Sequence, residues 1–132
     1  MTEKLAKALF IAAGLYDGLL GIVFFSFSSE IFDFYGVTPP NHVAYIQFPA
    51  LLLLVFAIMF FRIANEPIKN RELILYGSGL KLSYFGLAFW HDVTVGIPSM
   101  WMPWAWGDLV WFILFLAAWL RLGRMTAKAE TS

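Results

Sequence analysis

Four long apolar stretches, separated by short polar segments, constrain the fold of this chain more than any other feature. They cover residues 8–27, 43–61, 73–90 and 101–120. A helix needs about 20 mostly apolar residues to cross the hydrocarbon core of a bilayer. Hydrophobic residues make up 61% of the chain and charged residues 14%, against roughly 45–50% and 25% in soluble domains. The sequence therefore predicts an all-α membrane protein with four transmembrane helices.

Short connections join these stretches, so consecutive helices are expected to be antiparallel neighbours in one bundle. We predict a single transmembrane domain over residues 1–124, followed by a frayed polar tail over residues 125–132. In the first connection, Ser28 or Ser29 is expected to cap one further helical turn, which Gly36 ends.

The cationic residues gather at one end of the predicted bundle. Eight of the nine Lys and Arg residues flank the apolar stretches there: Lys4, Lys7, Arg62, Lys69, Arg71, Arg121, Arg124 and Lys128. Cytoplasmic loops of membrane proteins carry an excess of Lys and Arg. This pattern predicts a multi-pass protein of the bacterial inner membrane with both termini in the cytoplasm. We call this end the basic end, and the opposite end, with the first and third connections, the far end.

Charge and composition exclude several classes of function. The formal net charge is zero, so no basic field is available to bind nucleic acid. The chain has no cysteine, which rules out disulfides, Cys-ligated zinc and iron–sulfur clusters. The two histidines, His42 and His91, both fall at the far end, and we predict no metal site and no cofactor. No nucleophile–base pair, metal triad or phosphate-binding loop is present, so no catalytic residue is predicted and an enzyme is the least favoured of the functions considered.

Three charged residues fall inside the apolar stretches: Asp17, Lys81 and Asp108. Each costs several kcal/mol if it stays unpaired in hydrocarbon. At 1.5 Å per residue, Asp17 and Lys81 both lie about 15 Å from the basic end, and Asp108 lies about 20 Å from it. We therefore predict a buried cluster centred on Lys81. One carboxylate pairs with Lys81, and the other is protonated, hydrogen-bonded or in contact with water or a ligand; the sequence leaves open which is which.

Small residues surround the acid of the first helix. Gly14, Asp17, Gly18 and Gly21 follow helical spacing and share one face. Small residues on such a face let a second helix approach closely. We therefore expect Asp17 to point into the bundle.

Further polar side chains are expected at the same depth. Helical spacing places Ser78 and Tyr84 on the face of Lys81, and Trp111 on the face of Asp108. Gln47 of the second helix falls near the level of Asp108, and Tyr16 and Tyr45 are expected nearby. The predicted polar cluster, whose members are the candidates for ligand binding, comprises Asp17, Gln47, Ser78, Lys81, Tyr84, Asp108 and Trp111.

Tryptophans gather at the start of the fourth apolar stretch. Trp101, Trp104 and Trp106 lie where the helix is expected to leave the membrane. Tryptophan is enriched at membrane–water interfaces, so we interpret the three as an interfacial belt. Pro103 is expected in the first turn of that helix, where its missing N–H group is not needed.

The strings AGLYDGLLGIVFF, GVTPPN, GSGLKLSYFGLAFW and PWAWGDLVWFILFLAAWLR extend over nearly the whole chain. Together they resemble a family of small four-helix bacterial integral membrane proteins, and DoxX-like proteins in architecture alone. The resemblance implies the four-helix fold and no particular activity. It singles out Asp17, Asn41, Lys81, Asp108 and Trp111. The chain departs from the family pattern at Asp17 and Gly107, where the family carries asparagine.

Three functions are compatible with a polar centre in such a bundle. The buried ions could fix helix register in a structural or accessory subunit of a larger membrane complex, which is our first expectation. The bundle could bind a lipid-like or quinone-like ligand. It could also act as a small proton- or ion-coupled transporter, which would need a homo-oligomer because four helices enclose little volume.

Overall fold

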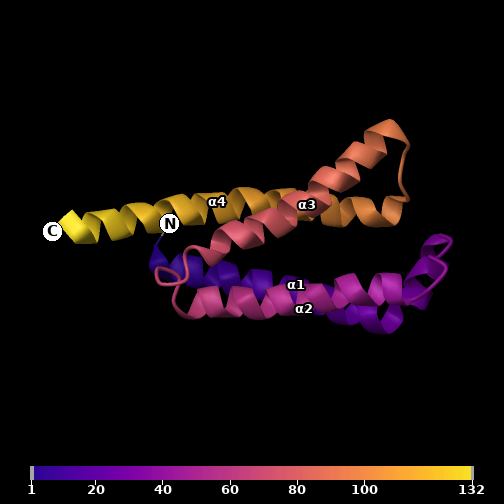
Figure 1. Cartoon of the computed structure of the whole chain (residues 1–132), viewed down its shortest axis with the longest axis horizontal. Coiled ribbons are helices and arrows are strands. Elements are labelled where there is room, and N and C mark those ends of the chain that lie inside the picture. The colour runs from indigo at the N-terminus through magenta and orange to yellow at the C-terminus, as the bar shows by residue number, and fades with distance from the viewer. Residues whose placement is uncertain (1, 132) are drawn as a thin grey trace.

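The computed structural model describes residues 2–131, and this part of the chain forms four α-helices and one short 3-10 helix (Figure 1). The helices are α1 (Glu3–Tyr35), α2 (Ala44–Asn65), α3 (Leu73–Thr94) and α4 (Met102–Thr131), with the 3-10 helix η1 (Ser99–Trp101) directly before α4. Residues 2–131 contain no β-strand. The all-α prediction is therefore confirmed.

Three helical segments are long and apolar enough to cross a membrane: α1, α2 and the segment from η1 through α4. The remaining helix, α3, has the same 22-residue length as α2. It is less apolar because Lys81 and a run of glycine, serine and tyrosine residues interrupt it. Three of the predicted spans are thus confirmed by length and composition, while the span over α3 stays a prediction.

The helices pair along the chain, α1 mainly with α2 and α3 mainly with α4. The start of α1 and the end of α4 lie at the same end as the connection between α2 and α3 (Figure 1). Residues 36–43 and 95–98 lie at the other end. From the basic end, α3 crosses α4 obliquely and ends well away from α2. The two helical hairpins therefore diverge toward the far end.

The glycine face of α1 packs against α2. An added Cβ at Gly14 would lie 2.6 Å from the Phe61 ring, and one at Gly21 would lie 2.7 Å from the Ala50 carbonyl oxygen. Such distances leave no space for a side chain. The close approach predicted from the small residues is confirmed, and its partner is α2.

Substitution of Gly21 by alanine is expected to lower the free energy of unfolding by about 1–3 kcal/mol, because the backbone of α2 must move away. Gly79→Ala is the matched control, since nothing lies within 4 Å of an added Cβ there. That change is expected to stabilise α3 by up to about 1 kcal/mol. Thermal unfolding of both variants in detergent measures the difference. Equal unfolding temperatures would contradict the tight α1–α2 contact.

The ends of α1 and α4 differ from the sequence prediction. The turn expected near Ser28 is continuous with α1 beyond a kink at Phe27, and Gly36 ends the helix with a φ of 65°. That left-handed conformation suits glycine, so Gly36 is confirmed as the stop. The prediction of a frayed tail is wrong for residues 125–131, where α4 continues through Thr131. Alanine, lysine and glutamate in this segment favour a helix. Ser132 lies outside the described residues.

Two apolar cores lie at different levels along the helices. The core nearer the basic end draws on all four helices and consists of Ala6, Phe10, Ala13, Phe60, Ile63, Ala64, Ile74, Phe115, Ala118 and Leu122. The core nearer the far end is smaller and consists of Phe24, Phe32, Ala50 and Met100. Asp17 lies between the two cores along α1. The charged centre therefore has dense apolar packing on its basic side and looser packing on its far side.

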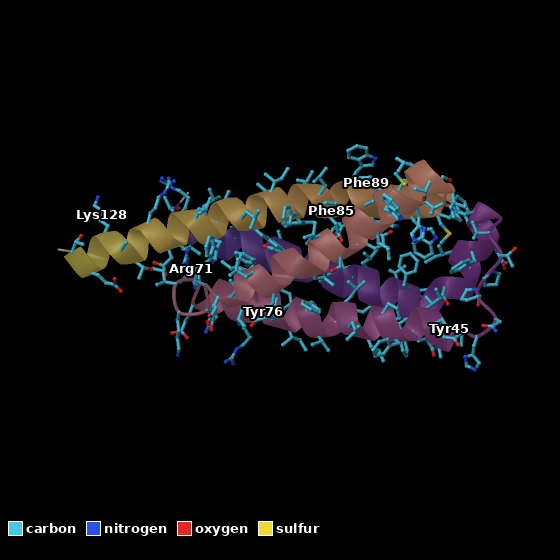
Figure 2. The ribbon with its side chains drawn as sticks, turned by 45° about the horizontal axis from the view of Figure 1, so that its top comes forward. Tyr45, Arg71, Tyr76, Phe85, Phe89 and Lys128 are labelled. Carbon is cyan, nitrogen blue, oxygen red and sulfur yellow. The ribbon has the colours of Figure 1, made fainter. Side chains whose placement is uncertain are left out.

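Arg71 anchors the connection between the hairpins to α4. Its Nε donates a hydrogen bond to the Trp119 carbonyl oxygen at 2.7 Å, and its guanidinium carbon lies 4.2 Å from the centroid of the Trp119 ring. Figure 2 shows Arg71 at the basic end, and Phe85 and Phe89 further along α3. Phe85 packs on Phe112, and Phe89 on Trp106, so aromatic contacts hold α3 on α4.

Candidate functional site

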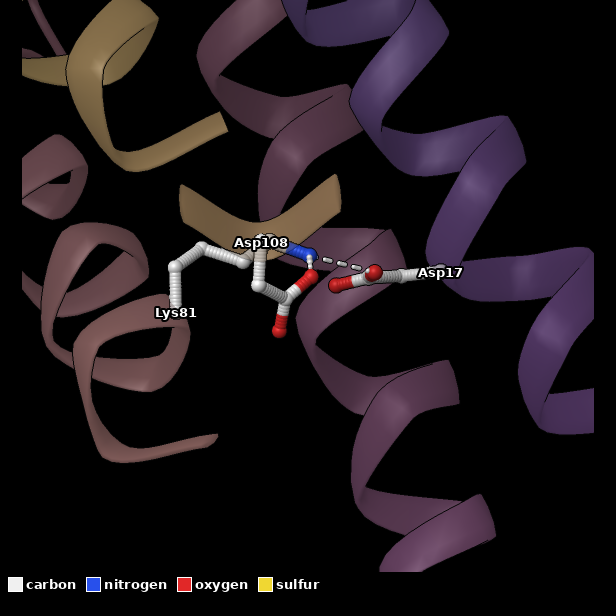
Figure 3. A network of polar contacts seen from close by, with 3 residues as sticks. All are labelled: Asp17, Lys81 and Asp108. Carbon is white, nitrogen blue, oxygen red and sulfur yellow. Dashed lines mark hydrogen bonds and ion pairs between the residues drawn. The ribbon is translucent and has the colours of Figure 1, made fainter. Parts of the chain in front are cut away.

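Asp17, Lys81 and Asp108 meet in the interior, as the depth argument predicts (Figure 3). The Lys81 Nζ donates to Asp17 Oδ1 at 2.7 Å and to Asp108 Oδ1 at 3.2 Å. Relative exposure is 0% for Asp17, 1% for Lys81 and 8% for Asp108. These three residues, supplied by α1, α3 and α4, are called the charged cluster below.

The structure answers which acid pairs with the lysine: both do. A single ammonium group therefore serves two carboxylates, and the cluster carries one excess negative charge when all three groups are ionised. Asp17 Oδ2 is buried and has no hydrogen-bond partner within residues 2–131. A buried acceptor without a donor is costly, so a further hydrogen-bond donor beside Asp17 Oδ2 would stabilise the cluster.

Two aromatic rings complete the surroundings of the ammonium group. The Lys81 Nζ lies 5.2 Å from the centroid of the Tyr16 ring and 5.8 Å from that of Phe60. Ring faces attract cations at such distances. An added Cβ at Gly107 would lie 2.7 Å from the Tyr16 hydroxyl oxygen, so the glycine leaves room for that tyrosine. Sequence reasoning placed Tyr16 near the cluster and missed Phe60, which nothing distinguishes from other apolar residues of its helix.

The hydroxyl groups of Tyr84 and Ser78, two further predicted residues, are hydrogen-bonded to backbone carbonyl oxygens. The Tyr84 hydroxyl donates to the Trp101 carbonyl oxygen at 2.8 Å. Ser78 is buried, but its Oγ donates to the Ile74 carbonyl oxygen of its own helix at 2.9 Å. Neither hydroxyl is hydrogen-bonded to a carboxylate of the cluster.

Trp111, Gln47 and Tyr45 lie outside the charged cluster. Trp111 packs on Tyr16 and Phe115, with centroid distances of 5.7 Å and 5.8 Å. Gln47 is half-buried and does not line the cavity described below. Tyr45 is exposed, so the expectation that it lies near the cluster is wrong. Depth alone placed Gln47 and Tyr45, and depth does not determine which way a side chain faces.

A cavity of about 480 Å³ extends from the charged cluster between the two hairpins. Asp17 and Asp108 line it together with apolar and aromatic residues of all four helices. The lining residues are Asp17, Leu20, Phe24, Ile46, Pro49, Ala50, Leu52, Leu53, Leu80, Tyr84, Leu87, Ala88, His91, Ile97, Trp101, Trp104 and Asp108. Ligand pockets commonly measure about 300–1,000 Å³ and combine apolar walls with a few polar groups. This space, called the far-end cavity below, has that character.

The far-end cavity is open at the side of the molecule. Pro49 and Leu52 of α2 and Leu87 of α3 belong to its lining and are also exposed. The opening follows from the divergence of α3 from α2. A molecule can therefore approach the charged cluster from the apolar flank of the protein, where Asp108 is 8% exposed and Asp17 forms part of the buried wall.

Two of the three tryptophans expected in an interfacial belt line the far-end cavity, and the belt itself stays a prediction. Trp101 and Trp104 line the cavity and pack on Phe24 with centroid distances of 5.7 Å and 6.5 Å. Trp106 is exposed, as a belt residue would be. The signal was in the spacing, since Trp101, Trp104 and Asp108 recur at intervals of three and four and so share a helical face.

The charged cluster is closed on its basic side by three fully buried phenylalanines, Phe10, Phe60 and Phe115. Their ring centroids lie 5.0 Å to 6.2 Å apart. We call these residues the phenylalanine layer. Access to the carboxylates is therefore one-sided, through the far-end cavity.

Fold and site together define a helical protein with three candidate membrane spans and a buried ionic cluster beneath an apolar cavity. Comparisons of the chain with protein-family models, curated proteins and solved structures found no match. The resemblance to small four-helix membrane proteins stays a prediction.

Proposed function

We propose that this chain is a four-span protein of the bacterial inner membrane that binds a lipid-like or quinone-like ligand in the far-end cavity. The observation that carries the proposal is an apolar cavity of about 480 Å³ that ends on two buried carboxylates, both of them paired with Lys81. Apolar walls suit the body of such a ligand, and the charged cluster orients its polar group.

The side chains of α3 support its membrane span. Gly77, Ser78 and Lys81 are buried, whereas Leu82, Leu87 and other exposed side chains of the helix are largely apolar. A transmembrane helix is expected to hide polar groups in the bundle and to present apolar groups to lipid. The gathering of Lys and Arg at the basic end supports cytoplasmic termini.

The one-sided cavity favours binding over transport. A proton- or ion-coupled transporter needs access to its site from both sides of the membrane, and the phenylalanine layer closes the basic side. Transport by a homo-oligomer and an accessory role in a larger complex stay predictions. Mass spectrometry of protein released from its native membrane distinguishes ligand binding from both alternatives. A small ligand adds little mass, whereas a second copy of this chain or a different partner chain adds much more.

Ala88→Phe is expected to abolish copurification of a small ligand. Ala88 is buried and lines the cavity, so a phenyl ring there occupies the volume that the ligand needs. Ala117→Phe, on the exposed face of α4, is the matched control. The measurement is native mass spectrometry of both variants and the parent. Binding in the cavity predicts a bound mass on the parent and the control, and none on Ala88→Phe. Equal retention by both variants would place the ligand elsewhere.

A further inference from the structure

We infer that the ligand is an amphiphile with a primary-amine head group, held between Asp17 and Asp108 beside Lys81. This inference rests on the proposed function and specifies its chemistry. It follows from the charge of the cluster, the unpartnered oxygen of Asp17, the small number of oxygen ligands and the side opening of the cavity.

The charge of the cluster favours a cationic head group. Lys81 is the only cation in contact with the two carboxylates within residues 2–131. A second ammonium group would bring the set to neutrality. An anionic head group would add a third negative charge in a site with little water, where like charges repel strongly.

Hydrogen bonding favours a head group that donates. Asp17 Oδ2 is buried without a donor. Asp108 receives its one ammonium contact at the longer distance of 3.2 Å, through Oδ1. A primary ammonium has three N–H groups, enough to serve both carboxylates at once. A quaternary ammonium carries the charge without these donors, so it satisfies only half of the requirement.

The ligand set is too small for a metal ion. Calcium takes six to eight oxygen ligands, and magnesium requires near-octahedral geometry. Residues 2–131 contain no group of three or more His, Cys, Asp or Glu side chains able to hold a metal. A cation that brings its own apolar tail fits better, because most of the cavity wall is apolar.

The side opening sets the path of the tail. Leu20 and Phe24 line the cavity beyond Asp17, and the exposed Leu52 and Leu87 flank the opening between α2 and α3. An amphiphile can therefore place its head at the carboxylates while its tail leaves through the opening among apolar side chains. This geometry points to a ligand drawn from the bilayer.

Four probes with the same twelve-carbon chain test the head group: dodecylamine, dodecyltrimethylammonium, dodecanol and dodecanoic acid. Each is titrated into the full-length protein in phosphatidylcholine nanodiscs, and the shift in unfolding temperature gives an apparent affinity, since a ligand that binds the folded state stabilises it. Dodecylamine is expected to bind on the order of tenfold or more tightly than dodecanoic acid, because a hydrogen bond to a charged group adds about that factor. The trimethylammonium and alcohol probes are expected to lie between them.

Two variants test whether the preference for dodecylamine depends on the charged cluster. Asp108→Asn leaves a neutral Asp17–Lys81 pair and is expected to remove most of the advantage of dodecylamine over dodecanol. Asp92→Asn, an exposed acid outside the cavity, is the matched control and is expected to keep it. If Asp108→Asn fails to fold, the head-group series on the parent protein still decides the question.

Two failures are distinguishable. If all four probes bind the parent equally, and Ala88→Phe abolishes their binding, the cavity binds amphiphiles but does not select an amine, and the inference is overturned. If no probe stabilises the parent more than it stabilises Ala88→Phe, the proposed function itself fails.

Discussion

Lys81→Met is expected to lower the free energy of unfolding by about 3–5 kcal/mol, because removal of one partner leaves uncompensated buried charge. Both Asp17 and Asp108 would lose their only ammonium contact within residues 2–131. Reversible unfolding in mixed detergent micelles measures the loss. Lys69→Met is the matched control and is expected to be nearly neutral, because Lys69 lies at the surface and pairs with the exposed Glu66.

A triple variant tests whether the loss of stability comes from unpaired charge or from lost packing in the charged cluster. Asp17→Asn, Lys81→Met and Asp108→Asn together remove every ion, and neutral replacement of a whole buried ionic set is often tolerated. The triple variant is expected to recover most of the stability that Lys81→Met loses. A triple variant as unstable as the single one would show that packing of the lysine chain, rather than stranded charge, causes the loss.

A cysteine at position 88 is expected to react with a water-soluble thiol reagent on the order of tenfold or more faster than one at position 118, because the reagent can enter the far-end cavity but not the packed core, where apolar surroundings also suppress the reactive thiolate. Ala88 lines the far-end cavity, whereas Ala118 is fully buried in the core nearer the basic end. The parent chain has no cysteine, so each variant carries a single reporter. The measurement is the labelling rate in sealed vesicles of known protein orientation.

The side from which the reagent acts matters as much as the rate. Ala88→Cys is expected to react with reagent added at the far end, where the exposed His91 also lines the cavity, and to be protected from reagent confined to the basic end. The phenylalanine layer closes the latter route. Labelling from both sides at equal rates would contradict one-sided access and would support the prediction of a transporter.

The charged cluster was predictable because burial of charge is so costly. An ion inside an apolar helix needs a partner, and at 1.5 Å per residue the sequence gives its depth. Asp17, Lys81 and Asp108, which lie on three different helices, could therefore be placed together from the sequence alone. The glycine face of α1 was predictable for a similar reason, since a row of small residues implies a close neighbour.

The cavity was not predictable, because it depends on the direction of whole helices. Nothing in the local pattern of α3 shows that it diverges from α2 toward the far end. The same divergence decides that Leu87 flanks an opening and that Trp101 and Trp104 face inward. Apolar residues look alike in sequence whether they face lipid or a cavity, which is also why Phe60 was missed.

The contacts of Arg71 with Trp119 hold the helices together at the basic end. There the guanidinium group ties the link between the hairpins to Trp119, and one core joins all four helices. Helix α3 has 22 residues and is therefore about 33 Å long, so a rotation of about 5° at its start moves its other end by about 3 Å. A rotation of this size would change the width of the far-end cavity, while the core nearer the basic end would keep its packing.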